Sequence, residues 1–178
     1  MLRITEIKSP PSLELFSELV ELLQDAVAGG ASIGWTTTPD TKEARNYWTL
    51  VLGSAARGER RLFVATDEHV CAGAVQLALS WKPNQRHRGE VQKLLVHSQY
   101  RRRGLGSALV HALENAAAAA GLTLLVLDVR AGDPAEALYR KAGYQYVGTI
   151  PGYALSTKGV YEPSAFYFRR LAPAAGER

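Results

Sequence analysis

One stretch of the chain, residues 91–120, constrains the fold more than any other. Its first part, up to Val96, is apolar enough for a buried strand. A short basic loop with two glycines follows. The last part repeats apolar residues at the spacing of a helix, at Leu105, Leu109, Ala112, Leu113 and Ala116. The sequence therefore predicts a strand, a glycine-punctuated loop and a helix in direct succession.

The start of this helix is suited to binding an anion. The first turn of a helix leaves backbone N–H groups without partners and carries partial positive charge. Glycines let the backbone approach a ligand closely, and three arginines add charge to the loop. The residues involved are Arg101, Arg102, Arg103, Gly104 and Gly106. They predict a site for a phosphate-rich ligand. The spacing matches neither a P-loop nor a dinucleotide fingerprint.

Composition limits the classes of protein and ligand that remain. The 178 residues suit one domain, and 47% of them are hydrophobic, enough for a sizeable core. The formal charge of +4 gathers around residues 86–103 and suits a small polyanion. Nucleic acid is an alternative, but no interleaved basic and aromatic stripe supports it. We therefore expect no nucleic-acid partner.

Cysteine and histidine usage points to a reducing compartment without a bound metal. Cys71 is the only cysteine and lies in an apolar run, so we expect a core thiol. The four histidines show no metal-ligand spacing. No signal peptide and no apolar run of membrane-spanning length is visible. We expect a cytoplasmic protein with no metal site and no membrane partner.

The order of predicted elements indicates a mixed α/β fold. Helices are expected from Pro11 to Gly29, from the Thr38-Pro39 opening to Gly58, over 105–120, and from Asp133, as cap, to Gly143. Strands are expected at 2–8, 62–66, 70–81, 90–96, 122–128, 144–147 and 165–169. Residues 150–162 are expected to form a loop. One domain should span residues 1–172, followed by a disordered tail over 173–178.

Three local patterns resemble the GNAT superfamily of N-acetyltransferases. Arg101-x-x-Gly104-x-Gly106 resembles the family's acetyl-CoA loop, and Leu94-Leu95-Val96 its strand beside the pantetheine arm. Ala135-x-x-Leu138-Tyr139-x-x-x-Gly143-Tyr144 is similar to a third family motif. The resemblance covers essentially the whole chain. It implies a mostly antiparallel sheet of about seven strands flanked by four helices, and acetyl-CoA as cofactor.

The resemblance also implies which residues bind acetyl-CoA. Val96 would polarise the thioester carbonyl through its backbone N–H. Gly132 stands where the family usually has an asparagine, so that side-chain contact is missing. The implied cofactor-binding residues are Leu94, Leu95, Val96, Arg101, Arg102, Arg103, Gly104, Leu105, Gly106, Ser107 and Tyr139.

Four further segments resemble family members that acetylate a tabtoxin-like β-lactam antimetabolite. They are residues 29–34, 82–84, 90–94 and 151–153. They lie outside the shared cofactor motifs, in loops and strand ends where an acceptor would bind. The resemblance implies N-acetylation of a small-molecule amine, with antibiotic resistance or detoxification as the biological role. Acceptor pockets diverge within a fold, so the acceptor itself stays open.

Acetyl transfer to an amine needs a base for the ammonium and a proton for the departing thiolate. Glu90, at the start of the strand, is the first candidate base; an exposed strand-end glutamate is the alternative. We expect its side chain on the same face as Gln92 and Leu94. Asp128, at the end of the apolar strand, is the second candidate base or an ammonium ligand; capping of the next loop is the alternative. Tyr139 is the candidate acid or a core residue.

The acceptor site is less determined by the sequence. Candidate substrate-binding residues are Trp35, Trp81, Asn84, Lys93 and Tyr153; for each aromatic, packing is the alternative. Three other functions stay open: a protein or peptide N-acetyltransferase, a non-catalytic acyl-CoA or toxin-binding module, and a nucleic-acid-binding domain. A homodimer is compatible with the sequence.

Overall fold

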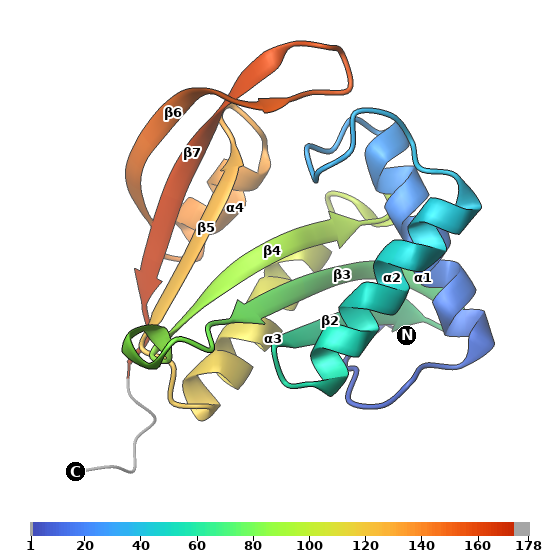
Figure 1. The fold of residues 1–178 in the computed structure, drawn as a ribbon, viewed down its shortest axis with the longest axis horizontal. Helices are drawn as coiled ribbons and strands as arrows, with labels where there is room; N and C mark the ends of the chain where they lie inside the picture. Colours follow the sequence, from blue (N-terminus) through green and yellow to red (C-terminus); the bar gives the residue numbers. More distant parts are fainter. Residues whose placement is uncertain (1, 173–178) are drawn as a thin grey trace.

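The computed structural model describes residues 2–172 and shows one mixed sheet with four α-helices (Figure 1). The strand order is β1-β2-β3-β4-β5-β7-β6, and all neighbours are antiparallel except β4 and β5. The predicted fold class is confirmed, whereas the predicted tail, 173–178, lies outside the described residues. The strands are β1 (Leu2–Glu6), β2 (Arg60–Asp67), β3 (Val70–Leu79), β4 (Arg88–Val96), β5 (Leu124–Arg130), β6 (Gln145–Leu155) and β7 (Tyr161–Arg170).

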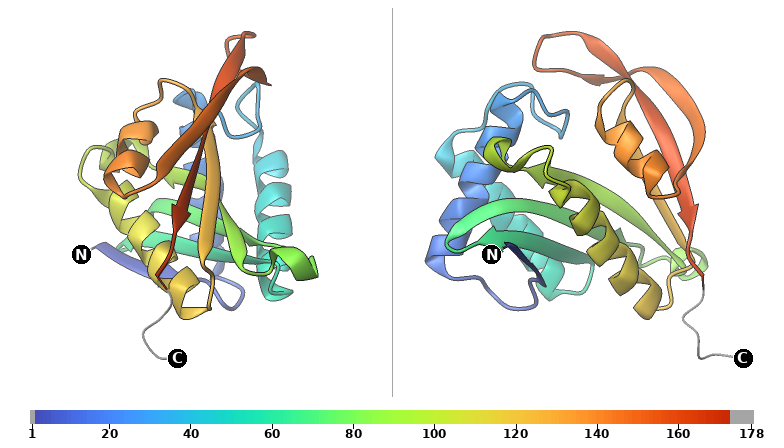
Figure 2. Two further views of the ribbon diagram at one scale, coloured as in Figure 1. Left: turned by 90° about the vertical axis from the view of Figure 1, so that its left-hand side faces the viewer. Right: turned by 180° about the vertical axis from the view of Figure 1, so that it is seen from behind.

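The helices of residues 2–172 cover both faces of the sheet (Figure 2). Helices α1 (Leu13–Ala28) and α2 (Thr41–Ala56) pack on one face, over β2, β3 and β4. Helices α3 (Leu105–Ala119) and α4 (Ala135–Lys141) pack on the other face. A hydrophobic core lies on each face of the sheet, the α1–α2 core on one side and the α3 core on the other. Strand β2 contributes alternate side chains to both, Leu62 and Val64 to the α1–α2 core and Phe63 and Ala65 to the α3 core.

The sheet splits between β4 and β5. These strands pair only over Arg88–Leu124, Gly89–Leu125 and Glu90–Val126. Beyond Glu90 the two strands diverge, as Figure 1 shows, and β4 loses its partner on that side. The short 3₁₀ turns Pro83–Gln85 and Ser98–Tyr100 flank β4 at its two ends. The split leaves backbone groups of one β4 edge without a neighbouring strand.

Some element boundaries differ from the prediction. The N-cap of α2 is Asp40, not Thr38, because Asp40 and Glu43 form a reciprocal capping box. Strand β5 runs two residues past Asp128 because it continues to pair with β7. Most of the predicted loop at 150–162 is strand, because β6 and β7 form a long hairpin with irregular register. The N-cap of α4 is Pro134, one residue after the predicted cap Asp133, which instead accepts from the Ala135 N–H at 2.9 Å in the turn before the helix.

Candidate active site

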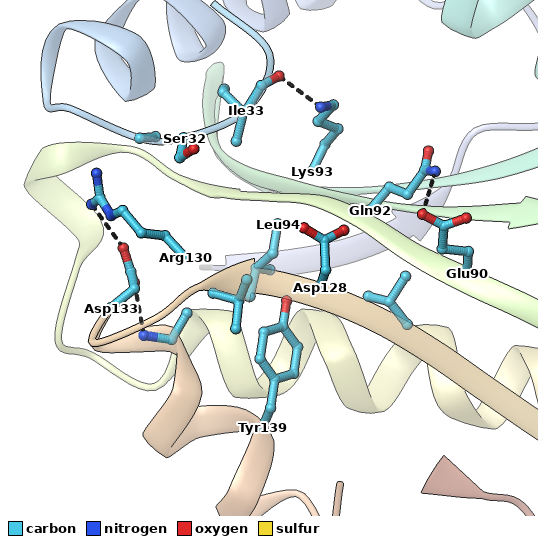
Figure 3. Close-up of a pocket in the computed structure, with 14 residues that line it drawn as sticks. Ser32, Ile33, Glu90, Gln92, Lys93, Leu94, Asp128, Arg130, Asp133 and Tyr139 are labelled. Atoms are coloured by element: carbon cyan, nitrogen blue, oxygen red, sulfur yellow. Dashed lines mark hydrogen bonds and ion pairs between the residues drawn. The ribbon is translucent and has the colours of Figure 1, made fainter. Parts of the chain in front are cut away.

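A cavity of about 270 Å³ lies where β4 and β5 separate (Figure 3). Strand β4 forms one wall and β5 the other, while the loop after α1 and the start of α4 close the ends. All three predicted catalytic side chains line it. The lining residues are Ala31, Ser32, Ile33, Glu90, Val91, Gln92, Lys93, Leu94, Asp128, Val129, Arg130, Asp133, Ala135 and Tyr139.

A β-bulge in β4 shapes this wall. Lys93 and Leu94 together stand opposite the single residue Val75 of β3, and Lys93 has a φ of 50°. The extra residue reverses the alternation of side chains. Leu94 therefore packs with the α3 core and Leu95 with the α1–α2 core. The expectation that Glu90, Gln92 and Leu94 share one face is wrong for Leu94, because period-two alternation fails at a bulge.

The two candidate bases are held by different partners. Gln92 Nε2 donates to Glu90 Oε1 at 2.9 Å, so one carboxylate oxygen of Glu90 is oriented by its own strand. Ser164 Oγ on β7 donates to Asp128 Oδ2 at 3.0 Å. Figure 3 shows the Asp128 side chain entering the cavity from β5 while Glu90 enters from β4. The two carboxylates thus reach one cavity from opposite sides of the split.

Tyr139 supplies a protonated hydroxyl beside these carboxylates. It lies on α4 with 6% of its surface exposed. Its hydroxyl points toward Asp128 in Figure 3. Burial raises the pKa of Tyr139 well above its ordinary value, and the charges of Asp133 and Asp128 raise it further. The phenol therefore stays protonated at neutral pH, as a proton donor requires.

Two cations flank the cavity, and they differ in how many donors are already used. Lys93 Nζ donates to the Ile33 carbonyl at 2.6 Å. An ammonium has three N–H donors, and this is its only hydrogen bond to residues 2–172, so two remain available. Burial lowers the pKa of Lys93, although the nearby Asp128 opposes that effect. Arg130, by contrast, already contacts Gly30, Glu162 and Asp133.

The arginine-glycine loop keeps its backbone donors free. Within residues 2–172, the N–H groups of 102–107 bond to no backbone or side-chain acceptor. Gly104, the N-cap of α3, has a φ of 80°, and a Cβ added there would meet nothing within 4 Å. A row of unpaired N–H groups at an open helix start fits the phosphates of acetyl-CoA. Gly106 has a second effect, because a Cβ there would lie 2.9 Å from Leu138 of α4.

The three arginines are not equivalent. Arg101 is tied to the protein, since its Nε donates to the Val96 carbonyl at 3.0 Å and its Nη2 lies 3.5 Å from Asp25. Arg103 stacks over the Tyr100 ring at 5.8 Å. Arg102 has a φ of 63° and is exposed. We infer that Arg102 and Arg103 are better placed than Arg101 to reach a phosphate.

The other implied cofactor residues differ in accessibility. Leu94 lines the cavity, and Val96 is half-buried on the same diverging part of β4. The side chain of Leu95 is buried against the opposite core, so only its backbone faces the split. Leu105 packs into the α3 core, and Ser107 sits half-buried in the first turn of that helix.

Four of the five predicted acceptor-binding residues lie outside the cavity lining. Trp81 has 78% of its surface exposed, and Asn84 is exposed in the turn after it. Trp35 packs edge-on against Tyr47 at 4.9 Å. Tyr153 packs edge-on against Phe166 at 5.3 Å, and Phe166 pairs with Asp128 in the sheet. Of the five predicted residues, Lys93 alone lines the cavity with the candidate bases.

Several lining residues were not identified from the sequence. Arg130 lines the cavity from β5, and Ser32 and Ile33 line it from the loop after α1. Ser164 on β7 does not line the cavity but donates to Asp128, which does. Their positions depend on strand pairing and loop packing between distant segments. No local motif marks them, although Ser32 and Ile33 fall in the segment 29–34 that resembles toxin-acetylating members.

Two further features of residues 2–172 bear on other functions. None of the helices in residues 2–172 has the length and hydropathy that a membrane span needs. In the same part of the chain, no group of three or more His, Cys, Asp or Glu side chains is arranged to hold a metal ion. The Cys71 thiol is buried, and burial raises its pKa to about 12. It is therefore unsuited to act as a nucleophile.

Comparison with known proteins adds independent findings. The model of the acetyltransferase (GNAT) family matches residues 22–144. An uncharacterized N-acetyltransferase in the hisH-hisA intergenic region of Azospirillum brasilense is 35% identical over 115 residues, 64% of this chain and 67% of its own length. The L-methionine sulfoximine/L-methionine sulfone acetyltransferase of Pseudomonas paraeruginosa is 31% identical over 138 residues, 75% of this chain and 76% of its own length.

A solved structure supports the same fold. It is that of a phosphinothricin acetyltransferase from Sinorhizobium meliloti in complex with acetyl-CoA. The TM-score is 0.74 at 19% identity, and the match covers 97% of this chain and 94% of the other. At this identity the likeness bears on the fold alone.

Proposed function

The chain belongs to the acetyltransferase (GNAT) family, as an N-acetyltransferase that uses acetyl-CoA, and we propose that its acceptor is the amine of a small α-amino acid or close analogue. One observation carries the proposal. One cavity contains two carboxylates, Glu90 and Asp128, and a half-buried ammonium, Lys93, that has donors to spare. The carboxylates suit a substrate ammonium, and Lys93 suits a substrate carboxylate.

Each residue has a distinct role in the proposed reaction. Acetyl-CoA, when bound, supplies an acetyl thioester. Asp128, held by Ser164, keeps the substrate ammonium in place. Glu90 accepts the proton from that ammonium, directly or through one water, so that a neutral amine can attack. Tyr139 donates its phenolic proton to the departing sulfur, and it regains a proton from the one that the nitrogen loses as the amide forms, directly or through water. The free N–H groups of residues 102–107 hold the phosphates.

The relatives suggest which amino-acid analogues to test. One relative is named for L-methionine sulfoximine and L-methionine sulfone, and the similar solved structure for phosphinothricin. The segments 29–34 and 151–153 resemble the tabtoxin resistance protein. Inactivation of an antimetabolite or another antibiotic is therefore the biological role that we propose.

The cavity supports a small acceptor better than a protein. Ala31, Ser32 and Ile33 close one end of it, and Lys93 ties this loop to β4. A peptide chain would need an open groove in that position. A non-catalytic binding module stays an alternative that only turnover can separate from an enzyme.

The test measures thiol release from acetyl-CoA with a panel of amines. The panel contains L-methionine sulfoximine, phosphinothricin, a tabtoxin-type β-lactam, aminoglycosides, peptides, and the methyl esters of the amino acids. We expect turnover with free amino-acid analogues and a much higher KM for their esters, since Lys93 would lose its partner. Glu90→Gln should lower kcat by roughly 10² to 10⁴. A loss under about threefold would move the base role to Asp128.

The same panel separates the rivals. Release with peptides but not amino acids would indicate a protein acetyltransferase. If acetyl-CoA binds but no amine releases thiol, the binding-module alternative replaces the proposal.

A further inference from the structure

We propose that Arg60, on β2, is a positioning residue that orients the carboxylate of Glu90 through the side chain of Gln92. Arg60 does not line the cavity. Its effect would pass along a chain of side-chain hydrogen bonds that crosses β2, β3 and β4. The inference rests on the proposed function, in which Glu90 accepts the substrate proton.

This chain of hydrogen bonds has a defined direction. Arg60 Nη1 donates to Gln92 Oε1 at 2.9 Å and to Gln76 Oε1 at 2.5 Å. A guanidinium has donors but no acceptor, so both amides must turn their oxygens toward it. The amide nitrogen of Gln92 therefore faces the other way, and it donates to Glu90 Oε1 at 2.9 Å (Figure 3). Arg60 thus determines which atom Gln92 presents to Glu90.

The end of this hydrogen-bond chain that lies away from Glu90 is held in the hydrophobic core. Gln76 is completely buried on β3, and its Nε2 donates to the Tyr47 hydroxyl at 2.8 Å. The Tyr47 ring packs edge-on against Trp35 and Trp48. Because both sides of Gln76 are held, Arg60 has one stable place for its guanidinium, and Gln92 has one favoured amide orientation.

This arrangement leaves one carboxylate oxygen of Glu90, Oε2, available to the substrate. Its Oε1 is occupied by Gln92, while Oε2 has no hydrogen-bond partner in residues 2–172. The cavity-lining carboxylate can therefore accept a substrate proton without first breaking a protein contact. A purely structural role explains Arg60 less well, because its Nε is buried without a partner among the described residues. Such an unmade bond is costly, and it is tolerated more readily where a residue has a further role.

The experiment uses four variants of the full chain, Arg60→Met, Gln92→Leu, the double variant and Arg60→Lys. We expect Arg60→Met and Gln92→Leu each to lower kcat roughly 10- to 100-fold, because a misplaced base loses its near-attack geometry. The KM for acetyl-CoA should not change. The double variant should be no slower than the slower single variant, because both act through one contact. Arg60→Lys keeps a donor-only cation and should retain most of kcat.

The control is Arg57→Met, which removes an exposed arginine paired with Glu59 and should keep full activity. Calorimetry with acetyl-CoA checks that each variant is folded. Additive losses in the double variant, an equal loss in Arg60→Lys, or unchanged kcat in Gln92→Leu would each overturn the inference. If Arg60→Met does not fold, Gln92→Leu and Arg60→Lys still decide it by these outcomes. If Glu90→Gln keeps full activity, the base role moves to Asp128 and this inference fails while the proposed function stands. If acetyl-CoA binds but no amine releases thiol, the proposed function itself fails.

Discussion

At the scale of single residues, the phosphate site depends on the backbone of Gly104. With a φ of 80°, this residue ends the loop and opens α3 without placing a side chain over the first turn. A residue with a Cβ could take up this conformation only at a cost of about 1 kcal/mol or more. It would also place a methyl group beside the N–H groups that are left for an anion.

A matched pair of glycines separates these two effects. Gly121, at the other end of α3, has a φ of 78° and equally open surroundings. Gly104→Ala and Gly121→Ala should therefore lose similar stability. Only Gly104→Ala should weaken acetyl-CoA binding, by roughly tenfold or more, because it crowds charge-assisted hydrogen bonds. Isothermal calorimetry measures the affinities, and equal affinities in the two variants would refute the loop assignment.

The sequence could predict some of the site's residues for a physical reason. Glu90 begins one apolar strand and Asp128 ends another, while Tyr139 belongs to the third family motif, and all three line one cavity. Lys93 could be named, but not its contact with Ile33, because a φ of 50° inside a strand has no sequence signature when the residue is not glycine. Trp81 was a poor candidate because an aromatic at a strand end can equally well point to solvent.

At the scale of elements, the strands were predicted better than their ends. Apolar runs mark β2, β3, β4 and β5 because these strands are buried. The β6–β7 hairpin was missed in part because β6 is an edge strand whose side chains are mostly exposed. An exposed strand does not alternate strongly, so its length depends on pairing that the sequence alone does not reveal.

The edge strand β1 gives a prediction at this scale. Arg61 on β2 makes two hydrogen bonds to the Glu6 carboxylate, at 2.7 and 2.8 Å, and a third to the Ala116 carbonyl of α3. The Arg61 hydrogen bond lowers the pKa of Glu6, against a smaller opposing effect of burial. A carboxyl with a lowered pKa in the folded state stabilises the fold above its unfolded pKa, and this contribution fades as pH falls through the folded pKa.

Glu6→Gln should therefore destabilise the protein by about 1 to 2 kcal/mol at pH 7. The difference from the wild type should shrink as the pH falls through the lowered pKa of the folded Glu6 carboxyl, because the native side chain then also becomes neutral. Urea denaturation across this pH range measures the difference in the free energy of unfolding between the variant and the wild type. Glu14→Gln, at an exposed carboxylate on α1, is the control and should show little difference at either pH. A Glu6→Gln deficit that persists undiminished at low pH would assign the effect to packing instead.

At the scale of the whole molecule, the site exists because the sheet is divided. One part, β1 to β4 with α1, α2 and α3, carries Glu90, Lys93 and the free N–H groups. The other, β5 to β7 with α4, carries Asp128 and Tyr139. Strands β4 and β5 pair over only three residue pairs, so few backbone bonds join the parts at the split. A ligand lying in the split would contact both parts of the sheet. Its affinity would therefore depend on how the two parts are positioned relative to each other.

Hydrogen exchange tests this view directly. Without ligand, the N–H groups of 102–107 have no acceptor in residues 2–172 and should exchange fast. Acetyl-CoA should slow exchange there and along the diverging part of β4, 92–96, because it would supply the missing acceptors. Exchange in β1 and β2 should not change locally.

Ligand should also raise the melting temperature with concentration, as binding to the folded state alone requires. In Gly104→Ala the slowing at 102–107 should largely vanish at the same ligand concentration. Protection spread evenly over the sheet, with none at 102–107, would mean that acetyl-CoA stabilises the fold from another site.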